Sequence, residues 1–175
     1  ANFIGHRRRA KELLLALAEY GKKTHYAINF STEVSLDVAE DDELLALFQQ
    51  ANFTLVYIGI ESPNVESLKE TKKNQNLRFP LLEQIHKVQS YGMIVWAGMI
   101  VGFDHDTTKI FGLQEDFFKS SRIPITSLGP LVALPTTPLF ARMQQEGRLL
   151  AEANLHAVTD KNLPVLHNNG GFTNF

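Results

Sequence analysis

The sequence predicts an α/β protein with a parallel sheet, and three observations support this fold class. Four short apolar runs rich in β-branched and aromatic residues alternate with amphipathic helical patterns. No hairpin signal lies between the runs, so right-handed crossovers and parallel pairing are expected. Residues 93–101 are almost wholly apolar and are followed by Gly102, which is typical of a strand buried on both faces of a parallel sheet.

The length of the chain favours an incomplete barrel. A full eight-unit (β/α) barrel takes about 250 residues, so four units in 175 residues predict a partial (β/α) TIM-like barrel or a doubly wound sheet. No glycine-rich dinucleotide fingerprint and no P-loop follows any run, which counts against the doubly wound alternative. We expect the partial barrel over residues 1–150. Residues 151–175 lose the periodicity and predict an irregular extension.

The first half of the chain predicts two strands and three helices. Residues 7–20 carry a helical apolar stripe that Gly21 should stop, and residues 27–33 form a short strand. A second helix opens at Asp41 and extends to about residue 51, where its apolar stripe ends. Residues 54–60 form the next buried strand, and residues 65–71 a short helix.

The second half repeats the same β/α scheme. Pro80 lies in the first turn of a helix that Gly92 ends, and residues 93–102 form the third strand. Residues 108–120 form a helix and residues 123–134 the last strand. A final helix from about residue 138 to 146 is closed by Gly147.

Composition excludes several function classes. A formal net charge of −2 and a pI of about 6.3 give no electrostatic attraction to nucleic acid. No apolar stretch approaches the roughly 18–20 residues of a membrane span, and no signal segment is visible, so a cytoplasmic location is expected. The sequence contains no cysteine, which rules out disulfides and thiolate-bound metals from this chain alone. A small-molecule ligand remains the natural partner.

Polar residues follow each predicted strand, and ligands of such sheets gather beyond the carboxyl ends of the strands. Four groups should therefore share one edge of the sheet: Glu33 with Ser35, Glu61 with Ser62, residues 102–106, and residues 134–137. Hydroxyl and carboxylate groups there can bind a small molecule. For any single one of these residues, an equally good interpretation is that its side chain bonds the loop backbone or caps a helix.

Asp104, His105 and Asp106 have side chains suited to a metal ion, but adjacent residues rarely all reach one ion. Asp106 or Thr107 suits the N-cap of the following helix better, so no metal site is predicted. Gly98 and Gly102 let a flat ring approach the backbone, or else serve tight packing. Trp96 is expected in the core.

Five segments resemble, in order, the later part of the radical SAM domain, in the branch often found behind a cobalamin-binding domain. Residues 2–10 are similar to the DDNFIGN-type segment of that branch, without its two leading acids. The other segments are similar to the ends of its third to sixth strands: residues 30–35, 57–63 with 68–73, 96–104 and 131–139.

The resemblance implies a six-strand partial barrel that binds S-adenosylmethionine beside a 4Fe-4S cluster and generates a 5'-deoxyadenosyl radical for use on a substrate. The resemblance also allows cobalamin in the parent protein and leaves its use open. Position by position, it implies that Glu61 and Ser62 lie near the ribose and Glu33 and Ser35 toward the methionine or ribose. It also implies that Gly98, Ile100 and Gly102 lie under the adenine and that Val132 and Leu134 lie along its edge. The implied cofactor-binding residues are therefore Glu33, Ser35, Glu61, Ser62, Gly98, Ile100, Gly102, Val132 and Leu134.

The CxxxCxxC loop that binds the cluster in this family has no counterpart here, because the sequence has no cysteine. The expectation is therefore strands three to six of a radical SAM iron–sulfur oxidoreductase or transferase, inactive alone. A non-catalytic barrel-derived binding domain and a cluster-free α/β-barrel enzyme using Asp104 and His105 remain open. An exposed first strand at residues 27–33 would favour self-association through the barrel edge.

Overall fold

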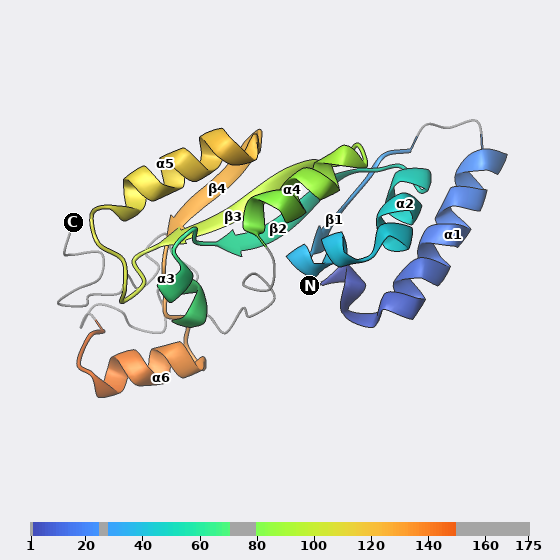
Figure 1. Cartoon of the computed structure of the whole chain (residues 1–175). Coiled ribbons are helices and arrows are strands. Elements are labelled where there is room, and N and C mark those ends of the chain that lie inside the picture. The colour runs from blue at the N-terminus through green and yellow to red at the C-terminus, as the bar shows by residue number, and fades with distance from the viewer. Residues whose placement is uncertain (1, 25–27, 71–79, 150–175) are drawn as a thin grey trace.

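A computed structural model describes residues 2–24, 28–70 and 80–149 and shows a four-stranded parallel sheet (Figure 1). The strands pair in chain order, each parallel to the next. They are β1 (Phe30–Val34), β2 (Phe53–Glu61), β3 (Ile94–Val101) and β4 (Ile125–Pro130). The predicted α/β class and the partial-barrel order of β/α units are confirmed.

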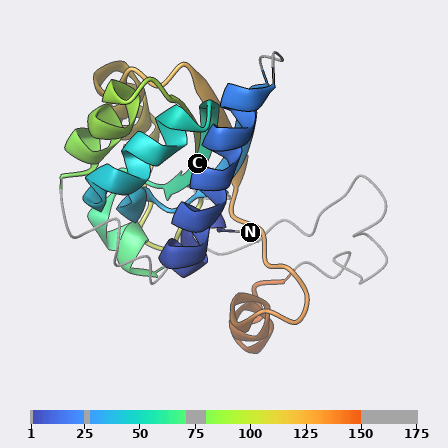
Figure 2. The same ribbon diagram turned by 90° about the vertical axis from the view of Figure 1, so that its right-hand side faces the viewer.

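Helices connect the strands, and most of them cover one face of the sheet. They are α1 (Arg7–Lys23), α2 (Asp42–Gln50), α3 (Val65–Glu70), α4 (Leu81–Ser90), α5 (Ile110–Ser121) and α6 (Pro138–Gln145), with 3-10 turns at η1 (Phe3–His6) and η2 (Leu36–Glu40). Both views show α6 set apart from the helices that pack on the sheet (Figures 1 and 2). No helix that the structure describes is long and apolar enough to cross a membrane.

The core lies between the sheet and these helices. Side chains alternate along a strand, so every second residue of β2 and β3 points toward the helices and is buried: Val56, Ile58, Ile60, Val95, Ala97 and Met99. They pack in one cluster with apolar residues of the helices, such as Leu14, Phe48 and Ile85. The amphipathic stripes predicted for these helices are therefore the surfaces that bury the sheet.

The opposite sheet face, here called the open face, is much less covered. Ile94, Trp96 and Ile125 lie on it with 45%, 36% and 40% exposure. The prediction that Trp96 belongs to the core was wrong, and burial of β3 on both faces holds only toward its carboxyl end, from Ala97 onward. A long apolar run predicts a strand, but it does not distinguish a packed face from the inner face of an incomplete barrel.

Several element boundaries differ from the predictions. Gly21 lies inside α1, which continues to Lys23. The last strand is shorter than residues 123–134, and α5 begins at Ile110 after Lys109 rather than at residue 108. Gly92 and Gly147 follow α4 and α6 with φ of 83° and 66°, as predicted for glycine stops. The predicted extension at 151–175 and residues 71–73 of the family-like segments lie outside the described residues.

Candidate functional site

The carboxyl ends of β2, β3 and β4 meet at one edge of the sheet, here called the rim. In the parallel register Glu61 pairs with Met99, and Val101 pairs with Pro130. The Leu131 amide donates a hydrogen bond of 2.8 Å to the Val101 carbonyl, which keeps the segment after β4 beside β3. The strand ends that carry Glu61, Gly102 and residues 131–134 therefore converge, as the parallel topology predicts (Figure 1).

Two residues of the rim have a strained backbone conformation. Glu61 and Thr136 have φ of 71° and 70°, in the left-handed region that side chains other than glycine and asparagine rarely adopt. A register shift between Gly59 and Glu61 shows that β2 is bulged just before it ends. Bulges redirect side chains beside functional sites, and left-handed non-glycine residues, at a cost of about 1 kcal/mol or more, gather there too. Glu61 combines both features.

Ser62 has a structural contact of its own. Its side chain is fully buried, and its hydroxyl accepts a 3.1 Å hydrogen bond from the Asn64 amide. The Asn64 side chain in turn accepts from the Glu66 amide at 3.1 Å. The Ser62 hydroxyl therefore shapes the turn between β2 and α3, which orients Glu61.

Asp106 holds the loop after β3. Its carboxylate is 6% exposed and accepts hydrogen bonds from the amides of Gly102 and Phe103 at 2.9 and 3.1 Å. The Ser67 hydroxyl of α3 donates to its other oxygen at 2.7 Å. Because Gly102 has a φ of 98°, only a glycine suits this bend without strain. Asp106 thus joins the loops that follow β2 and β3.

These contacts bear on the metal and capping interpretations. Asp106 is not the N-cap of α5, and neither is Thr107: the cap position is Lys109, whose amide donates to the Thr107 hydroxyl at 3.4 Å. Within the described ranges, no group of three histidine, aspartate or glutamate side chains could hold a metal ion. Asp104 and Asp106 instead serve different partners.

Asp104 links the β3 loop to the end of the described chain. Arg142 of α6 reaches its carboxylate at 2.9 Å, and Arg148 also donates to it. Arg148 bonds Glu146 at 2.6 Å as well. Burial lowers the pKa of Arg148, but its hydrogen bonds to the two carboxylates outweigh burial and raise that pKa. This ion-pair group holds α6 and the preceding segment, which includes the fully buried Ala133, against the rim.

Glu33 and Ser35 stand at the end of β1, two strands away from β3. Ser35 is held by Asn2, whose side-chain oxygen accepts from the Ser35 amide at 3.2 Å and whose nitrogen donates to the Ser35 hydroxyl at 2.9 Å. That hydroxyl also donates to Asp37. Glu33 is exposed on the open face and pairs in register with Tyr57. Ser35 thus connects the first turn of the chain to the rim.

Tyr57 is a residue that sequence reasoning did not identify. It lies on the open face of β2, and its ring meets Trp96 edge to face with centroids 5.6 Å apart. Its hydroxyl lies over Gly98 of β3, where an added Cβ would come within 2.1 Å of the oxygen. Burial, followed by the charges of Glu61 and Glu33, raises the pKa of Tyr57. Strand alternation back from Glu61 is the signal that could have found it.

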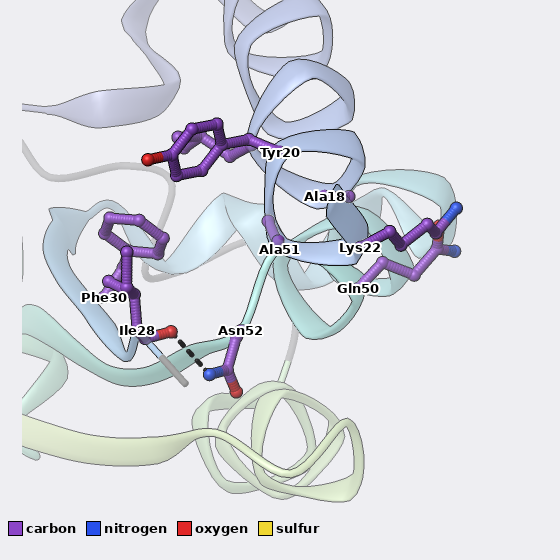
Figure 3. A pocket seen from close by; sticks show the side chains of 10 residues that line it. Ala18, Tyr20, Lys22, Ile28, Phe30, Gln50, Ala51 and Asn52 are labelled. Atoms are coloured by element: carbon purple, nitrogen blue, oxygen red, sulfur yellow. Dashed lines mark hydrogen bonds between the residues drawn. The ribbon is translucent and has the colours of Figure 1, made fainter. Parts of the chain in front are cut away.

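A hollow of about 260 Å³ lies away from the rim (Figure 3). It lies between the end of α1, the segment before β1 and the turn between α2 and β2, where the Asn52 side chain donates to the Ile28 carbonyl at 2.6 Å. This is the amino-terminal end of β1 and β2. Ligands of parallel sheets bind at the other end, so the rim remains the candidate site.

Comparison with known proteins points to one group of enzymes, although no protein-family model matches the chain. The chain is 38% identical over 163 residues to the hopanoid C-2 methylase of Rhodopseudomonas palustris, covering 93% of this chain and 31% of that protein. It is 40% identical over 152 residues to an uncharacterized methyltransferase of Synechocystis, covering 87% of this chain and 28% of that protein. The chain therefore spans about a third of these relatives.

A structure of the radical S-adenosylmethionine methyltransferase TsrM from Kitasatospora setae, with cobalamin and a [4Fe-4S] cluster bound, matches with a TM-score of 0.70 and 16% identity. The match covers 83% of this chain and 29% of TsrM. These cofactors of TsrM are those that the sequence resemblance implied. The chain is thus homologous to part of known methyltransferases, and its fold is that of part of a radical SAM domain.

Proposed function

We propose that the rim is the wall that holds the adenosyl part of S-adenosylmethionine in a cobalamin-dependent radical SAM methyltransferase. The observation that carries this proposal is Glu61, a glutamate held in left-handed backbone directly after a bulge, at the point where three strand ends meet. The homology to methyltransferases supports methyl transfer as the reaction class. The small-molecule acceptor of the methyl group belongs to the same proposal.

The residues at the rim fit an adenosyl group. The Glu61 carboxylate can accept hydrogen bonds from the two ribose hydroxyls, and Gly102 leaves no side chain between the end of β3 and a flat adenine ring. Gly98 makes room for the Tyr57 hydroxyl, which covers it, so it supports the adenine site from below. Ile100, half-buried between the two glycines, gives an apolar surface for the ring. Ser62 acts by fixing the backbone beside Glu61, because its hydroxyl already bonds Asn64.

The segment after β4 completes the wall. The Leu134 carbonyl accepts two hydrogen bonds from Thr137, one from its amide at 3.2 Å and one from its hydroxyl at 2.6 Å. The side chain of Leu134 is 48% exposed and offers an apolar edge, and the backbone of Val132 is the proposed polar contact of the adenine. Glu33 and Ser35 lie farther out, where the methionine end of the cofactor would extend.

The cluster does not fit this chain alone. A 4Fe-4S cluster needs thiolate ligands, and the 175-residue sequence has no cysteine. We therefore propose that these residues bind and orient the cofactor and do not themselves cleave it. Cobalamin, which TsrM binds, is proposed for the complete enzyme on the strength of the homology.

Equilibrium dialysis of the purified chain with radiolabelled S-adenosylmethionine tests the proposal. Glu61→Gln should weaken binding by about tenfold, the value of one charge-assisted hydrogen-bond pair. Glu115→Gln on α5 is the matched control, because Glu115 is exposed and pairs only with Lys119 among the partners that the structure gives it. Equal loss in both variants, or no saturable binding by the unmodified chain, would refute the rim as the site.

A further inference from the structure

The open face below the rim is built in rows that cross the sheet. The parallel register aligns Glu33 with Tyr57, Tyr57 with Trp96, and Trp96 with Ile125. The next row toward the rim is small, with Gly59 beside Gly98 and Gly98 beside Ser127. The small row makes room for the bulky one, because the Tyr57 hydroxyl lies over Gly98 and the Trp96 indole reaches Ser127. The two rows are about 7 Å apart along the strands.

The bulky row is fixed in place although it is exposed. The Trp96 indole nitrogen donates to the Ser127 hydroxyl at 2.9 Å, and Tyr57 meets the indole edge to face. Because the indole N–H already has an acceptor, the accessible remainder of Trp96 is apolar. Tyr57 cannot move toward β3 without meeting the Gly98 backbone. Two rigid aromatic side chains thus offer a prepared surface, which lowers the entropic cost of binding.

A hollow of about 310 Å³ lies on this row, between β1, β2 and β3. Its floor is Leu55, Tyr57 and Trp96, and β1 contributes the Ser31 and Glu33 side chains on one side. This size is at the lower limit of small-molecule sites, and the lining has the usual composition of apolar surface with a few polar groups. The polar groups stand together on β1, so a ligand would be oriented with its polar end toward that strand.

We propose that this hollow is the substrate wall of the methyltransferase, and that the substrate is a rigid, mainly apolar ring system carrying a hydroxyl or amino group. The ring system would stack on Tyr57 and Trp96, and its polar group would donate to the Ser31 hydroxyl, which leaves Glu33 to the cofactor. The negative charges that raise the pKa of Tyr57 disfavour an anionic substrate here. This assignment rests on the proposed function, because the wall lies about two to four residues below the adenosyl contacts on the same strands.

Trp96 is the only tryptophan of the chain, so it reports on its own site. Titration with 1-pyrenemethanol, a flat apolar ring system with one hydroxyl, should quench Trp96 emission and sensitise pyrene emission with a saturable curve. Tyr57→Ala, which removes a ring from the lining of the hollow, should weaken binding by at least about tenfold. Leu113→Ser, which removes a 47% exposed leucine on α5, should leave the curve unchanged. A second wall variant, Leu55→Ser, serves if Tyr57→Ala fails to fold.

Three outcomes would overturn the assignment. Binding that Leu113→Ser weakens as much as Tyr57→Ala is non-specific, and binding of 1-pyrenesulfonate equal to that of 1-pyrenemethanol contradicts the donor group. If the probe leaves Trp96 emission unchanged and sedimentation shows a dimer, the open face belongs to a second copy of the chain. Glu61→Gln should bind the probe normally. An unmodified chain that binds the probe but not S-adenosylmethionine refutes the proposed function, and one that binds S-adenosylmethionine but not the probe refutes the substrate wall.

Discussion

The carboxylate of Asp106 accepts a hydrogen bond of 2.9 Å from the Gly102 amide and so fixes the direction in which β3 leaves the sheet. The same carboxylate receives the Ser67 hydroxyl from α3. One buried carboxylate therefore fixes the loop after β3 and ties it to α3. Its consequences can be measured separately from ligand binding.

Asp106→Asn should lower the free energy of unfolding by about 2 kcal/mol. The substitution removes the charge from three buried hydrogen bonds and turns one acceptor into a donor facing Ser67. Urea denaturation followed by circular dichroism measures the loss. Asp116→Asn, on the exposed surface of α5, should change stability by less than about 0.5 kcal/mol. Similar effects of the two substitutions would show that Asp106 does not hold the loop.

Gly98→Ala should destabilise the protein by about 1–3 kcal/mol, because the new methyl group would overlap the Tyr57 hydroxyl. Gly129→Ala on β4 is the matched control, since nothing lies within 4 Å of a Cβ there. In a double-mutant cycle, Tyr57→Ala should remove most of the cost of Gly98→Ala. Additive effects of the two changes would mean that Tyr57 does not occupy the space over Gly98.

Asp104→Asn should increase hydrogen exchange of the α6 amides while the core strands stay protected. The carboxylate is the shared partner of Arg142 and Arg148, and its charge-assisted bonds are worth about 1–2 kcal/mol to the local opening of α6. Added salt should produce a smaller change in the same direction. Unaltered exchange in α6 would show that its own small apolar cluster, around Met143, is sufficient to hold it.

Tyr57 should ionise at higher pH than a free tyrosine. Burial and the charges of Glu61 and Glu33 raise its pKa in the folded protein, so the unfolded chain loses this proton first. The contribution of Tyr57 to stability is then fully present below about pH 10 and declines above it. The phenolate absorbance, taken as the difference between the unmodified chain and Tyr57→Phe, measures the shift. Glu33→Gln should lower this pKa, and an unchanged titration would exclude Glu33 as a cause.

Much of the fold could be predicted from the sequence because the spacing of apolar residues distinguishes strands from helices. The four apolar runs became β1 to β4, and the stripe ending near residue 51 became α2. Local boundary signals were weaker. Gly21 did not stop α1, because it lies within the helix and does not have the left-handed backbone of a glycine stop. The helix ends at Thr24 instead, where the backbone becomes extended.

The arrangement of the rim was predictable in outline and less so in detail. Glu61 and Gly102 were located from their positions after apolar strands, and parallel topology brought them together. The role of Asp106 depends on backbone amides that only the folded loop presents, so spacing suggested a helix cap instead. Trp96 was misplaced because hydrophobicity alone does not reveal which face of a strand lacks a covering layer.

The most direct test of the account is a nuclear magnetic resonance titration of the isotopically labelled chain with S-adenosylmethionine. The account predicts saturable shifts of the amides of Glu61, Ser62, Gly98, Ile100 and Gly102 and of residues 131–134. It predicts no shifts around the hollow near Asn52, at the other end of the sheet. Shifts confined to that hollow, or no saturable shift at the rim, would contradict the claim that these strand ends hold the adenosyl group.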